Sequence, residues 1–409
     1  MHTLSRFILL FLGLSTGFAA PAAHAQSWVA GPPMPTPRAE AAVSVLGGDL
    51  YVIGGRNVAG TPLGRVERFD GSEWETVASL RDERYAAAAA AYNGQIVLMG
   101  GYEDGGEITD DVEVYVVGEN DWESFEHMER DRAGHGAVVL NGSVYALGGV
   151  SGGGGPQAGT EVYDGDDWYL YAPWVLDPPR AYFGVANVGG VAYLAGGLSQ
   201  FGPLDLLERY AVGAGAEALA PLPSPRGGLA LAGTDGALFA IGGVDPSGTV
   251  LATVTRYDIA SNTWTPVASL NTAREGAVAA VIDGTIYVVG GRDANGNVLG
   301  TMERYLLSVD DEDDTTPTAF DLGAAYPNPF AGTTTLPLRL DRAGAVTLTV
   351  YDVRGRQVAV LVDGVLTAGE HRVAWDGTAD DGRRLAPGVY VARLTGAVGH
   401  AVTKLTLLR

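Results

Sequence analysis

A Gly-Gly pair that ends an apolar run recurs six times in this chain at almost constant spacing. The pairs begin at residues 54, 100, 148, 196, 242 and 290, so successive pairs lie 46 to 48 residues apart. An arginine stands 16 residues before each pair, at Arg38, Arg84, Arg132, Arg180, Arg226 and Arg274. A fixed period of this length indicates a repeat architecture, in which each unit buries its apolar faces against its neighbours.

Each unit is predicted to form four short antiparallel strands. Two apolar runs flank a turn such as Asn141-Gly142 or Asp283-Gly284, and such turns are strong hairpin signals. A third run carries an aromatic residue, and in most units a tryptophan follows it five to seven residues later, at Trp74, Trp122, Trp168 and Trp264. The six consecutive alanines at 86–91 therefore belong to a strand, although alanine favours helices.

Four-stranded sheets that repeat radially make a propeller, and small side chains suit the strand that crowds its axis. The Gly-Gly pairs, the spaced Tyr and Trp residues and the period resemble kelch repeats over about residues 27–307. This resemblance implies an all-β, six-bladed kelch β-propeller over 26–307. Unit four (209–223) lacks the tryptophan, so the pattern does not support an outer strand there. The segment around Trp28 is expected to supply the last blade's missing strand near Tyr305.

The first 25 residues are predicted to be a signal peptide. They combine a weakly basic start, an apolar stretch at 7–18 and an Ala-His-Ala cleavage signal at 23–25. No later segment reaches 18 apolar residues, so no transmembrane span is expected in the mature protein.

The chain after residue 307 has a different rhythm. Residues 308–319 are predicted to be an acidic linker, and alternating short strands over 320–409 predict a small Ig-like β-sandwich. The motifs Tyr-Pro-Asn-Pro-Phe (326–330), 350–358, 368–377 and 385–394 resemble the C-terminal sorting domain of the type IX (Por) secretion system, which is related to FlgD-like Ig modules. The resemblance implies export through that machinery to the medium or the outer cell surface. The alternative is an Ig-like accessory domain without a sorting role.

Composition excludes several classes of function. The formal net charge of −22 argues against a nucleic-acid partner. The absence of cysteine excludes disulfides, thiolate metal sites and chemistry of the galactose-oxidase type, which needs a Cys–Tyr cross-link. No standard hydrolase or nucleotide-binding motif is present, and the acidic run 310–314 lacks the EF-hand pattern. We therefore expect no metal and no cofactor, and His135 is the lone candidate acid or base.

The repeated arginines are the candidate ligand-binding residues. The resemblance places the loop before strand one and the loop after Gly-Gly on one face, so these arginines would ring one mouth of the axial channel. Guanidinium groups match carboxylates and phosphates geometrically. Arg56 and Arg292 directly follow their Gly-Gly pairs in the first and last units and extend this set. The predicted residues are Arg38, Arg56, Arg84, Arg132, Arg180, Arg226, Arg274 and Arg292.

Two alternatives limit this interpretation. The repeated arginines could instead brace the fold by pairing with the strand-three glutamates Glu67, Glu113, Glu161, Glu208 and Glu303. In that case Arg226, which faces Thr255, is the member left unpaired. Glu40 and Glu275 could likewise neutralise Arg56 and Arg292.

These observations favour a secreted or cell-surface, non-enzymatic binding protein. One propeller mouth would hold a protein or glycan ligand, with an anionic group as its expected feature. The alternative is a kelch-propeller enzyme acting on acidic sugars, similar to sialic-acid mutarotases. A third interpretation is a structural surface or adhesion protein.

Overall fold

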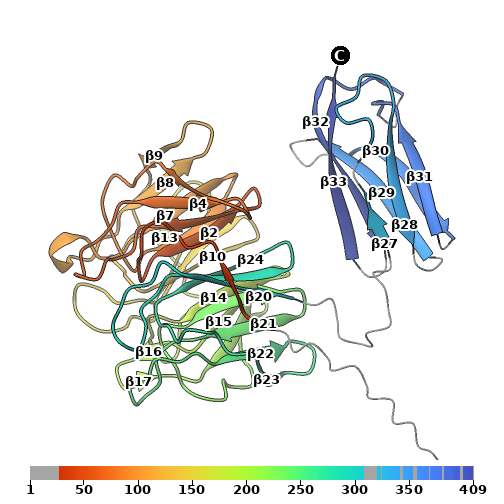
Figure 1. Cartoon of the computed structure of the whole chain (residues 1–409). Helices are drawn as coiled ribbons and strands as arrows, with labels where there is room; N and C mark the ends of the chain where they lie inside the picture. Colours follow the sequence, from red (N-terminus) through yellow and green to blue (C-terminus); the bar gives the residue numbers. More distant parts are fainter. Residues whose placement is uncertain are drawn as a thin grey trace, which may run out of the picture. The chain divides into compact units, whose positions relative to one another are not determined.

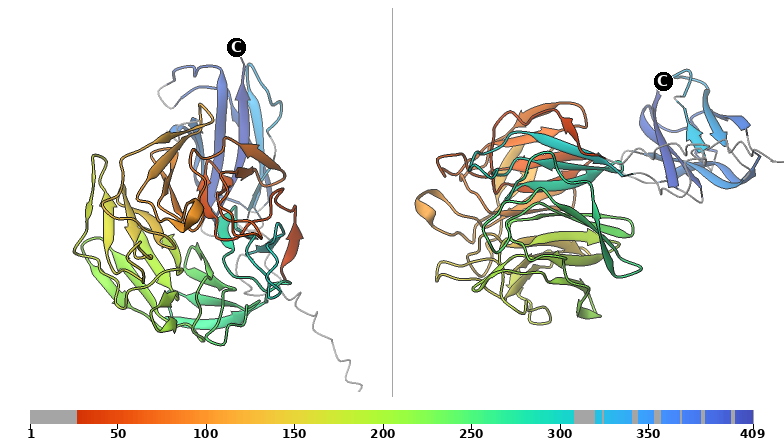
Figure 2. Two further views of the ribbon diagram at one scale, coloured as in Figure 1. Left: turned by 90° about the vertical axis from the view of Figure 1, so that its left-hand side faces the viewer. Right: turned by 60° about the horizontal axis from the view of Figure 1, so that its bottom comes forward.

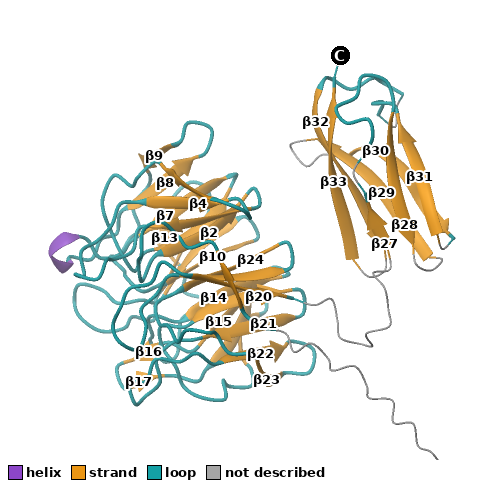
Figure 3. Ribbon diagram, viewed as in Figure 1, coloured by secondary structure: helices purple, strands orange, loops and turns teal. Residues whose placement is uncertain are grey.

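The computed structural model describes residues 27–307 and, within 320–408, all residues except 324, 341–343, 353–356, 368, 380–381 and 397–398. The chain divides into two compact units at residue 308. The described residues are almost all strands and loops; the helical element η1 (Asp104–Gly106) is a single 3₁₀ turn (Figure 3). None of the described helical residues form a helix long and apolar enough to cross a membrane. The predicted signal peptide (1–25) and linker (308–319) lie outside the described residues.

Six four-stranded antiparallel sheets, or blades, surround a common axis in the first unit (Figures 1 and 2). Blade 1 contains β2 (Ala42–Leu46), β3 (Asp49–Ile53), β4 (Val66–Phe69) and β5 (Trp74–Val77). Blade 2 contains β6 (Ala88–Tyr92), β7 (Gln95–Met99), β8 (Val112–Val116) and β9 (Asp121–Ser124). Blade 3 contains β10 (Gly136–Leu140), β11 (Ser143–Leu147), β12 (Thr160–Tyr163) and β13 (Trp168–Leu170).

The remaining blades repeat this order. Blade 4 contains β14 (Gly184–Val188), β15 (Val191–Ala195), β18 (Leu207–Ala211) and β19 (Gly215–Ala218), and its loop adds the short pair β16 (Leu198–Ser199) and β17 (Gly202–Pro203). Blade 5 contains β20 (Ala230–Thr234), β21 (Ala237–Ile241), β22 (Val254–Asp258) and β23 (Thr263–Val267). Blade 6 contains β24 (Val278–Ile282), β25 (Thr285–Val289), β26 (Met302–Leu306) and β1 (Val29–Gly31). The predicted all-β propeller of six blades is confirmed.

The N-terminal strand closes the ring. β1 pairs antiparallel with β26, with Val29 opposite Arg304. The Trp28 ring lies 5.1 Å from the Tyr305 ring, and its indole Nε1 donates to the carbonyl of Ala268 at 2.8 Å. The first and last described segments of the propeller therefore share one sheet, which prevents the circle from opening at its seam.

The alanine-rich stretch forms the innermost strand of blade 2. Ala88–Tyr92 is the strand β6, and the inner strands of all six blades line an axial channel of about 350 Å³. Their alternation sends one set of side chains toward the channel and the other between blades, where Ala88 and Ala90 are buried. Close approach to the axis favours small residues, and tertiary packing overrides helix propensity here.

Each Gly-Gly pair holds the arginine of the next blade. A Cβ on Gly54 would lie 2.5 Å from the carbonyl oxygen of Arg84, and the φ of Gly54 is +60°, so only glycine fits. The N–H of Gly55 donates to that same carbonyl at 2.9 Å. Equivalent bonds, at 2.9 to 3.0 Å, link every blade to the next, including Gly291 to Arg38 across the seam. This contact explains why the arginines and the Gly-Gly pairs share one period.

Blade 4 has a complete outer strand despite its missing tryptophan. β19 pairs with β18, so blade 4 has the four strands predicted for every unit, although the missing tryptophan had left its outer strand unsupported. The Trp174 ring, from the loop that precedes the blade, stacks on Tyr210 at 4.0 Å with an interplanar angle of 6°. An aromatic partner from a different position in the chain thus fills the place of the outer-strand tryptophan.

The C-terminal unit is a two-sheet sandwich of Ig-like form. One sheet has the order β27 (Phe320–Leu322), β28 (Thr334–Leu340) and β31 (Gly369–Trp375). The other has the order β30 (Gln357–Leu366), β29 (Gly344–Asp352), β32 (Gly388–Gly396) and β33 (Gly399–Leu407). In the Tyr-Pro-Asn-Pro-Phe motif, Phe330 is buried against Trp375, and the Asn328 amide bonds the Lys404 carbonyl and the Thr406 N–H at the edge of β33, both at 2.7 Å.

Candidate functional site

A closed ring of backbone hydrogen bonds surrounds the axis at one end of the propeller. It is formed by the residue two positions after each repeated arginine, and we call it the girdle. The N–H of each girdle residue donates to the carbonyl of the girdle residue in the preceding blade at 2.7 to 2.9 Å. The ring closes between the last and first blades, where the Glu40 N–H donates to the Gly276 carbonyl. All six residues have φ between 52° and 60°. The girdle residues are Glu40, Ala86, Gly134, Tyr182, Gly228 and Gly276.

The loops around the girdle form a mouth with two unlike halves. In every blade the residue after Gly-Gly pairs with the residue after the repeated arginine, so both loops lie on one face. Blades 6, 1 and 2 carry charged or aromatic residues at these positions, and blades 3, 4 and 5 carry only aliphatic residues or glycine. The polar sector comprises Tyr85, Tyr102, Arg56, Glu275 and Arg292, together with the girdle residue Glu40. The aliphatic sector pairs Ala133 with Val150, Ala181 with Leu198 and Gly227 with Val244.

Two ion pairs neutralise the arginines of the polar sector. Arg56 Nη2 bonds Glu40 Oε1, and Arg292 bonds Glu275 Oε1 through Nε at 3.0 Å and Nη2 at 2.5 Å. The arginine side chains remain 27% and 42% exposed, so both can still reach a ligand. Burial raises the pKa of Glu40, although Arg56 and Arg292 oppose this shift. Arg56 and Arg292 therefore form two ion pairs without net charge, as the alternative of neutralisation by Glu40 and Glu275 predicts.

Three tyrosines complete this surface. Tyr85 and Tyr102 stack with ring centroids 5.0 Å apart, and the Arg56 guanidinium lies 5.1 Å from the Tyr85 centroid. Tyr182 reaches the polar sector from blade 4: a Cβ on Gly134 would lie 2.9 Å from its ring, and its hydroxyl bonds Tyr102. Burial, Glu40 and Tyr102 all raise the pKa of Tyr182, so its phenol remains protonated at neutral pH.

The six repeated arginines do not line this mouth. Their exposure is 0 to 2%, so they have no surface to offer a ligand, and the ligand-binding interpretation is corrected for Arg38, Arg84, Arg132, Arg180, Arg226 and Arg274. Five of them pair with strand-three glutamates at 2.5 to 2.9 Å, as the bracing alternative predicts. A buried guanidinium needs such a partner because its desolvation penalty is otherwise uncompensated.

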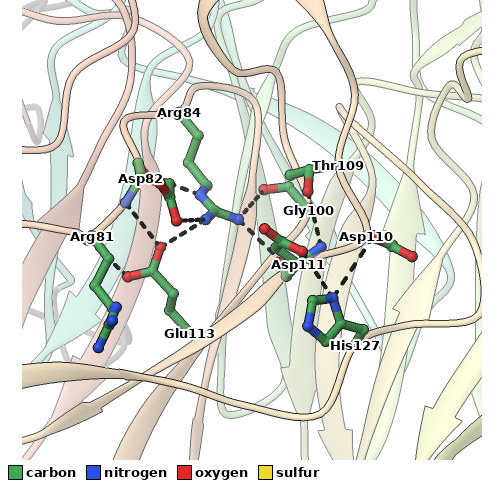
Figure 4. A network of polar contacts seen from close by, with 9 residues as sticks. All are labelled: Arg81, Asp82, Arg84, Gly100, Thr109, Asp110, Asp111, Glu113 and His127. Carbon is green, nitrogen blue, oxygen red and sulfur yellow. Dashed lines mark hydrogen bonds and ion pairs between the residues drawn. The ribbon is translucent and has the colours of Figure 1, made fainter.

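Figure 4 shows this brace in blade 2. Arg84 Nη2 donates to Glu113 Oε1 at 2.7 Å, and Nη1 donates to the carbonyls of Gly100 and Asp111 at 3.4 and 3.2 Å. Glu113 also accepts from the N–H of Arg81 at 2.9 Å. The arginine thereby ties the loop before β6 to both ends of the loop between β7 and β8 and to β8 itself.

Arg226 differs from the other five. Its Nη1 donates to the carbonyls of Gly242 and Thr253, and its Nη2 donates to the Ser224 hydroxyl at 2.9 Å. Thr255 stands at the glutamate position, and its buried hydroxyl has no hydrogen-bond partner among the described residues. Burial lowers the pKa of Arg226. Arg226 lacks a carboxylate partner, as predicted, but it is buried and not available to a ligand.

One exposed trio of side chains has the ligand types of a metal site. His127 Nδ1 lies 2.8 Å from Asp111 and 3.9 Å from Asp110, in the loops of blade 2 (Figure 4). All three side chains are 37 to 60% exposed, which is ordinary for solvated surface groups. Nothing else in the described structure points to an ion there.

Sequence reasoning found Arg56 and Arg292 but missed the tyrosines and the girdle. The sequence did contain one signal for this site: in the repeat position directly after Gly-Gly, Arg56, Tyr102 and Arg292 replace the aliphatic residues of the other blades. Tyr182 gave no such signal, because its girdle column already mixes Glu, Ala, Gly and Tyr.

Comparisons with known proteins agree with this architecture. The Kelch motif model matches residues 37–81, 83–129, 131–173, 225–271 and 273–310, which is more than half of the chain. The model of the FlgD Ig-like domain matches residues 325–399. All four strands of blade 4 lie outside these matches, although its sheet is complete. The C-terminal module is thus shown to be FlgD Ig-like, and its sorting role stays a prediction.

Two known proteins illustrate the extent of the likeness. Kelch-like protein 9 of Mus musculus is 34% identical over 91 residues, which are 21% of this chain and 15% of that protein. A solved structure titled "Structure of YjhT" matches with a TM-score of 0.58 and 18% identity, over 66% of this chain and 95% of that chain. At this identity the structural match supports the fold alone.

Proposed function

Since this chain belongs to the kelch-repeat family, we propose that its propeller is a binding module whose polar sector holds a carbohydrate. The comparison of equivalent positions between blades supports the site. In a six-fold repeat, the residue after Gly-Gly and the residue after the repeated arginine have the same structural role in every blade. The aliphatic sector shows that the fold is satisfied by valine, leucine, alanine or glycine at these positions. Charged and aromatic residues confined to three adjacent blades therefore serve something other than folding.

The chemistry of the polar sector fits a sugar. The stacked faces of Tyr85 and Tyr102 offer an apolar platform for the C–H face of a pyranose ring. The two Arg–Glu pairs present donors and acceptors side by side, which suits vicinal hydroxyl groups. Because these pairs are neutral overall, we favour a neutral or singly acidic sugar over a strongly acidic peptide, which would have to displace Glu40 and Glu275.

The repeat supplies matched variants for the test. Arg56→Val and Tyr102→Leu install the residues that blades 3 and 4 carry at the same position, so the fold should tolerate both. On a glycan array, each variant should lose the glycans that the wild-type protein binds, with at least a tenfold drop in affinity. Leu198→Val, in the aliphatic sector, is the control and should bind as wild type.

Two outcomes would redirect the proposal. Unchanged glycan binding by Arg56→Val and Tyr102→Leu would exclude the polar sector. Binding of peptides but not glycans on a parallel array, with the same sensitivity to the two variants, would keep the site and replace the ligand class.

An enzyme acting on acidic sugars is the alternative, and Glu40 is the observation that favours it. This carboxyl lies at the mouth beside the Arg56 guanidinium, and burial raises its pKa, which makes it the candidate acid or base of the polar sector. An NMR anomerisation assay on sialic acid distinguishes the two functions. Turnover that disappears in Glu40→Gln supports the enzyme, and inertness of the wild-type protein supports the binding module.

We also propose that the protein is exported and that the FlgD Ig-like module acts as its sorting signal. The signal-like segment 1–25 and the quoted C-terminal motifs support this route. Deletion of residues 320–409 should retain the propeller inside the cell envelope, as measured by immunoblots of cell fractions and medium. Unchanged secretion of the truncated chain would assign the module an accessory role.

A further inference from the structure

The loop after each Gly-Gly pair is a short hairpin on the mouth face, which we call a mouth hairpin, and that of blade 4 differs from the other five. In the other blades the residue after Gly-Gly pairs with the residue six positions later, as Tyr102 does with Ile108. In blade 4, Leu198 of β16 pairs with Pro203 of β17, which is only five positions later. Figure 3 shows β16 and β17 on the same side of the propeller as η1, the tip of the blade 2 mouth hairpin.

The tip of the blade 4 mouth hairpin carries Phe201, which is 90% exposed. The residues enclosed by the other mouth hairpins, all of which the structure describes, include no aromatic residue; they are 57–61, 103–107, 151–155, 245–249 and 293–297. Five hairpins without an aromatic residue show that the fold does not need one at this position. A ring that packs on almost nothing in its own chain indicates a contact with a ligand.

The hairpin holds Phe201 on a fixed support. The Ser199 hydroxyl accepts from the Phe201 N–H and donates to the Gly202 carbonyl, both at 3.1 Å. At its base, the Leu198 side chain packs so closely on Gly227 that a Cβ there would lie 2.3 Å from it. An aromatic ring on such a support loses little conformational entropy when it binds.

Blade 4 also reaches the polar sector, because the Tyr182 side chain crosses blade 3 and bonds Tyr102. Blade 3 lies between these two aromatic positions. Its mouth hairpin consists of Ser151 and four exposed glycines at 152–155. A chain-like ligand that starts on the stacked tyrosines therefore meets no bulky side chain in this hairpin on its way to Phe201.

We propose that the ligand is a linear oligosaccharide that crosses the mouth from the polar sector to blade 4, where the Phe201 ring stacks on a sugar residue further along the chain. This inference rests on the proposed carbohydrate-binding function and extends it from one sugar to a chain. The surroundings of the ring fit a neutral sugar. Gln200 is exposed and offers an amide donor and acceptor to hydroxyl groups, and residues 198–203 include no charged side chain.

Isothermal titration calorimetry of the full chain with sugars of increasing length tests this contact. Glucose, cellobiose, cellotetraose and cellohexaose form one series, and the corresponding sugars built from N-acetylglucosamine form the other. In at least one series we expect the wild-type affinity to rise at least tenfold from the disaccharide to the hexasaccharide. Phe201→Ala should bind the disaccharide as wild type and the hexasaccharide about 3- to 10-fold more weakly, the loss expected for one aromatic contact.

Two further variants separate stacking from other effects. Phe201→Trp keeps an aromatic face and should keep the wild-type affinity for the hexasaccharide. Val58→Ala removes a side chain of the blade 1 mouth hairpin, where Val58 is 77% exposed, and should leave the affinity for every sugar unchanged. The melting temperatures of all three variants should equal that of the wild type, because both positions are so exposed.

The two proposals fail in different ways. If Phe201→Ala binds the hexasaccharide as wild type, or weakens every length equally, the contact with a chain is overturned; Tyr102→Leu then decides separately whether the mouth binds sugar. If no sugar of either series binds, the oligosaccharide is overturned, and peptide binding that is lost in Phe201→Ala would assign the ring to a polypeptide. A loss confined to the longer sugars, with Tyr102→Leu weakening all of them, supports both proposals.

Discussion

Replacing Thr255 with glutamate should stabilise the propeller, because Arg226 is buried without a carboxylate partner. Blade 1 provides a template for the change: Pro-Thr-Pro-Arg at 35–38 matches Pro-Ser-Pro-Arg at 223–226. In blade 1 the glutamate at the Thr255 position, Glu67, accepts from its arginine at 2.8 Å and from the Thr36 hydroxyl at 2.7 Å. The Ser224 hydroxyl, which now accepts from Arg226, is placed to make the second of these bonds after rotation.

The expected gain follows from hydrogen bonds to charged groups. Such bonds contribute about 1.5 to 3 kcal/mol each, and the new carboxylate loses part of this when it is desolvated, so we expect a net gain of about 1 to 2 kcal/mol. An unfolding entropy of roughly 2 cal/mol/K per residue gives about 0.6 kcal/mol/K for a domain of this size, and hence a rise in melting temperature of about 2 to 3 °C.

Thermal unfolding of the full chain, followed by near-UV circular dichroism at pH 7, measures this gain. Thr255→Gln is the matched control, because it has the size of glutamate without the charge, and it should gain less. The reciprocal variant Glu161→Thr leaves Arg132 buried and unpaired and should lose about 3 to 5 kcal/mol. A melting temperature that does not change in either Thr255→Glu or Glu161→Thr would refute the bracing role of the Arg–Glu pairs.

Three further perturbations test other parts of the structure. Burial lowers the pKa of His135 in the folded state, so the unfolded state takes up the proton first and stability falls as pH drops below about 6.5, by up to ~1.4 kcal/mol per pH unit. Urea unfolding should show a smaller loss of the free energy of unfolding with falling pH in His135→Leu. Equal pH slopes for the two proteins would contradict this. Trp28→Ala removes the packing on Tyr305 and should cost about 3 to 5 kcal/mol, with faster proteolysis at the seam by mass spectrometry as the measurement. Gly54→Ala forces a Cβ to within 2.5 Å of the Arg84 carbonyl and should lower the melting temperature by several degrees, whereas Gly60→Ala, with nothing within 4 Å, should cost only about 1 kcal/mol for its left-handed φ.

The architecture was predictable because the features that build it recur. Arg38 and Gly54 share a period since each arginine carbonyl meets the previous blade's glycines, and six copies make that signal strong. Only the outer strand of blade 4 lacked its sequence signal, because Trp174 comes from a different place in the chain and stacks on Tyr210 only in three dimensions.

The site was harder to predict because repetition hides it. The repeated arginines were predicted to bind a ligand because they recur in every unit. A residue that recurs in every blade serves the structure that all blades share, and the spacing of residues does not show whether they are buried. Arg56 and Arg292 could be found because they directly follow their Gly-Gly pairs. Tyr182, in contrast, reaches across blade 3 to Tyr102 of blade 2, a contact between positions 80 residues apart that no local pattern encodes.

The girdle sets how this mouth can acquire specificity. Its six amides and six carbonyls face one another around the axis, so the main chain at the floor has no dipole left to point at a ligand. The girdle N–H groups are therefore not available to capture an anion in the way a phosphate loop does. Ligand recognition at this mouth therefore depends on a few side chains around the girdle, whose backbone stays unchanged. Exchanging those side chains alone should give the same scaffold a new ligand.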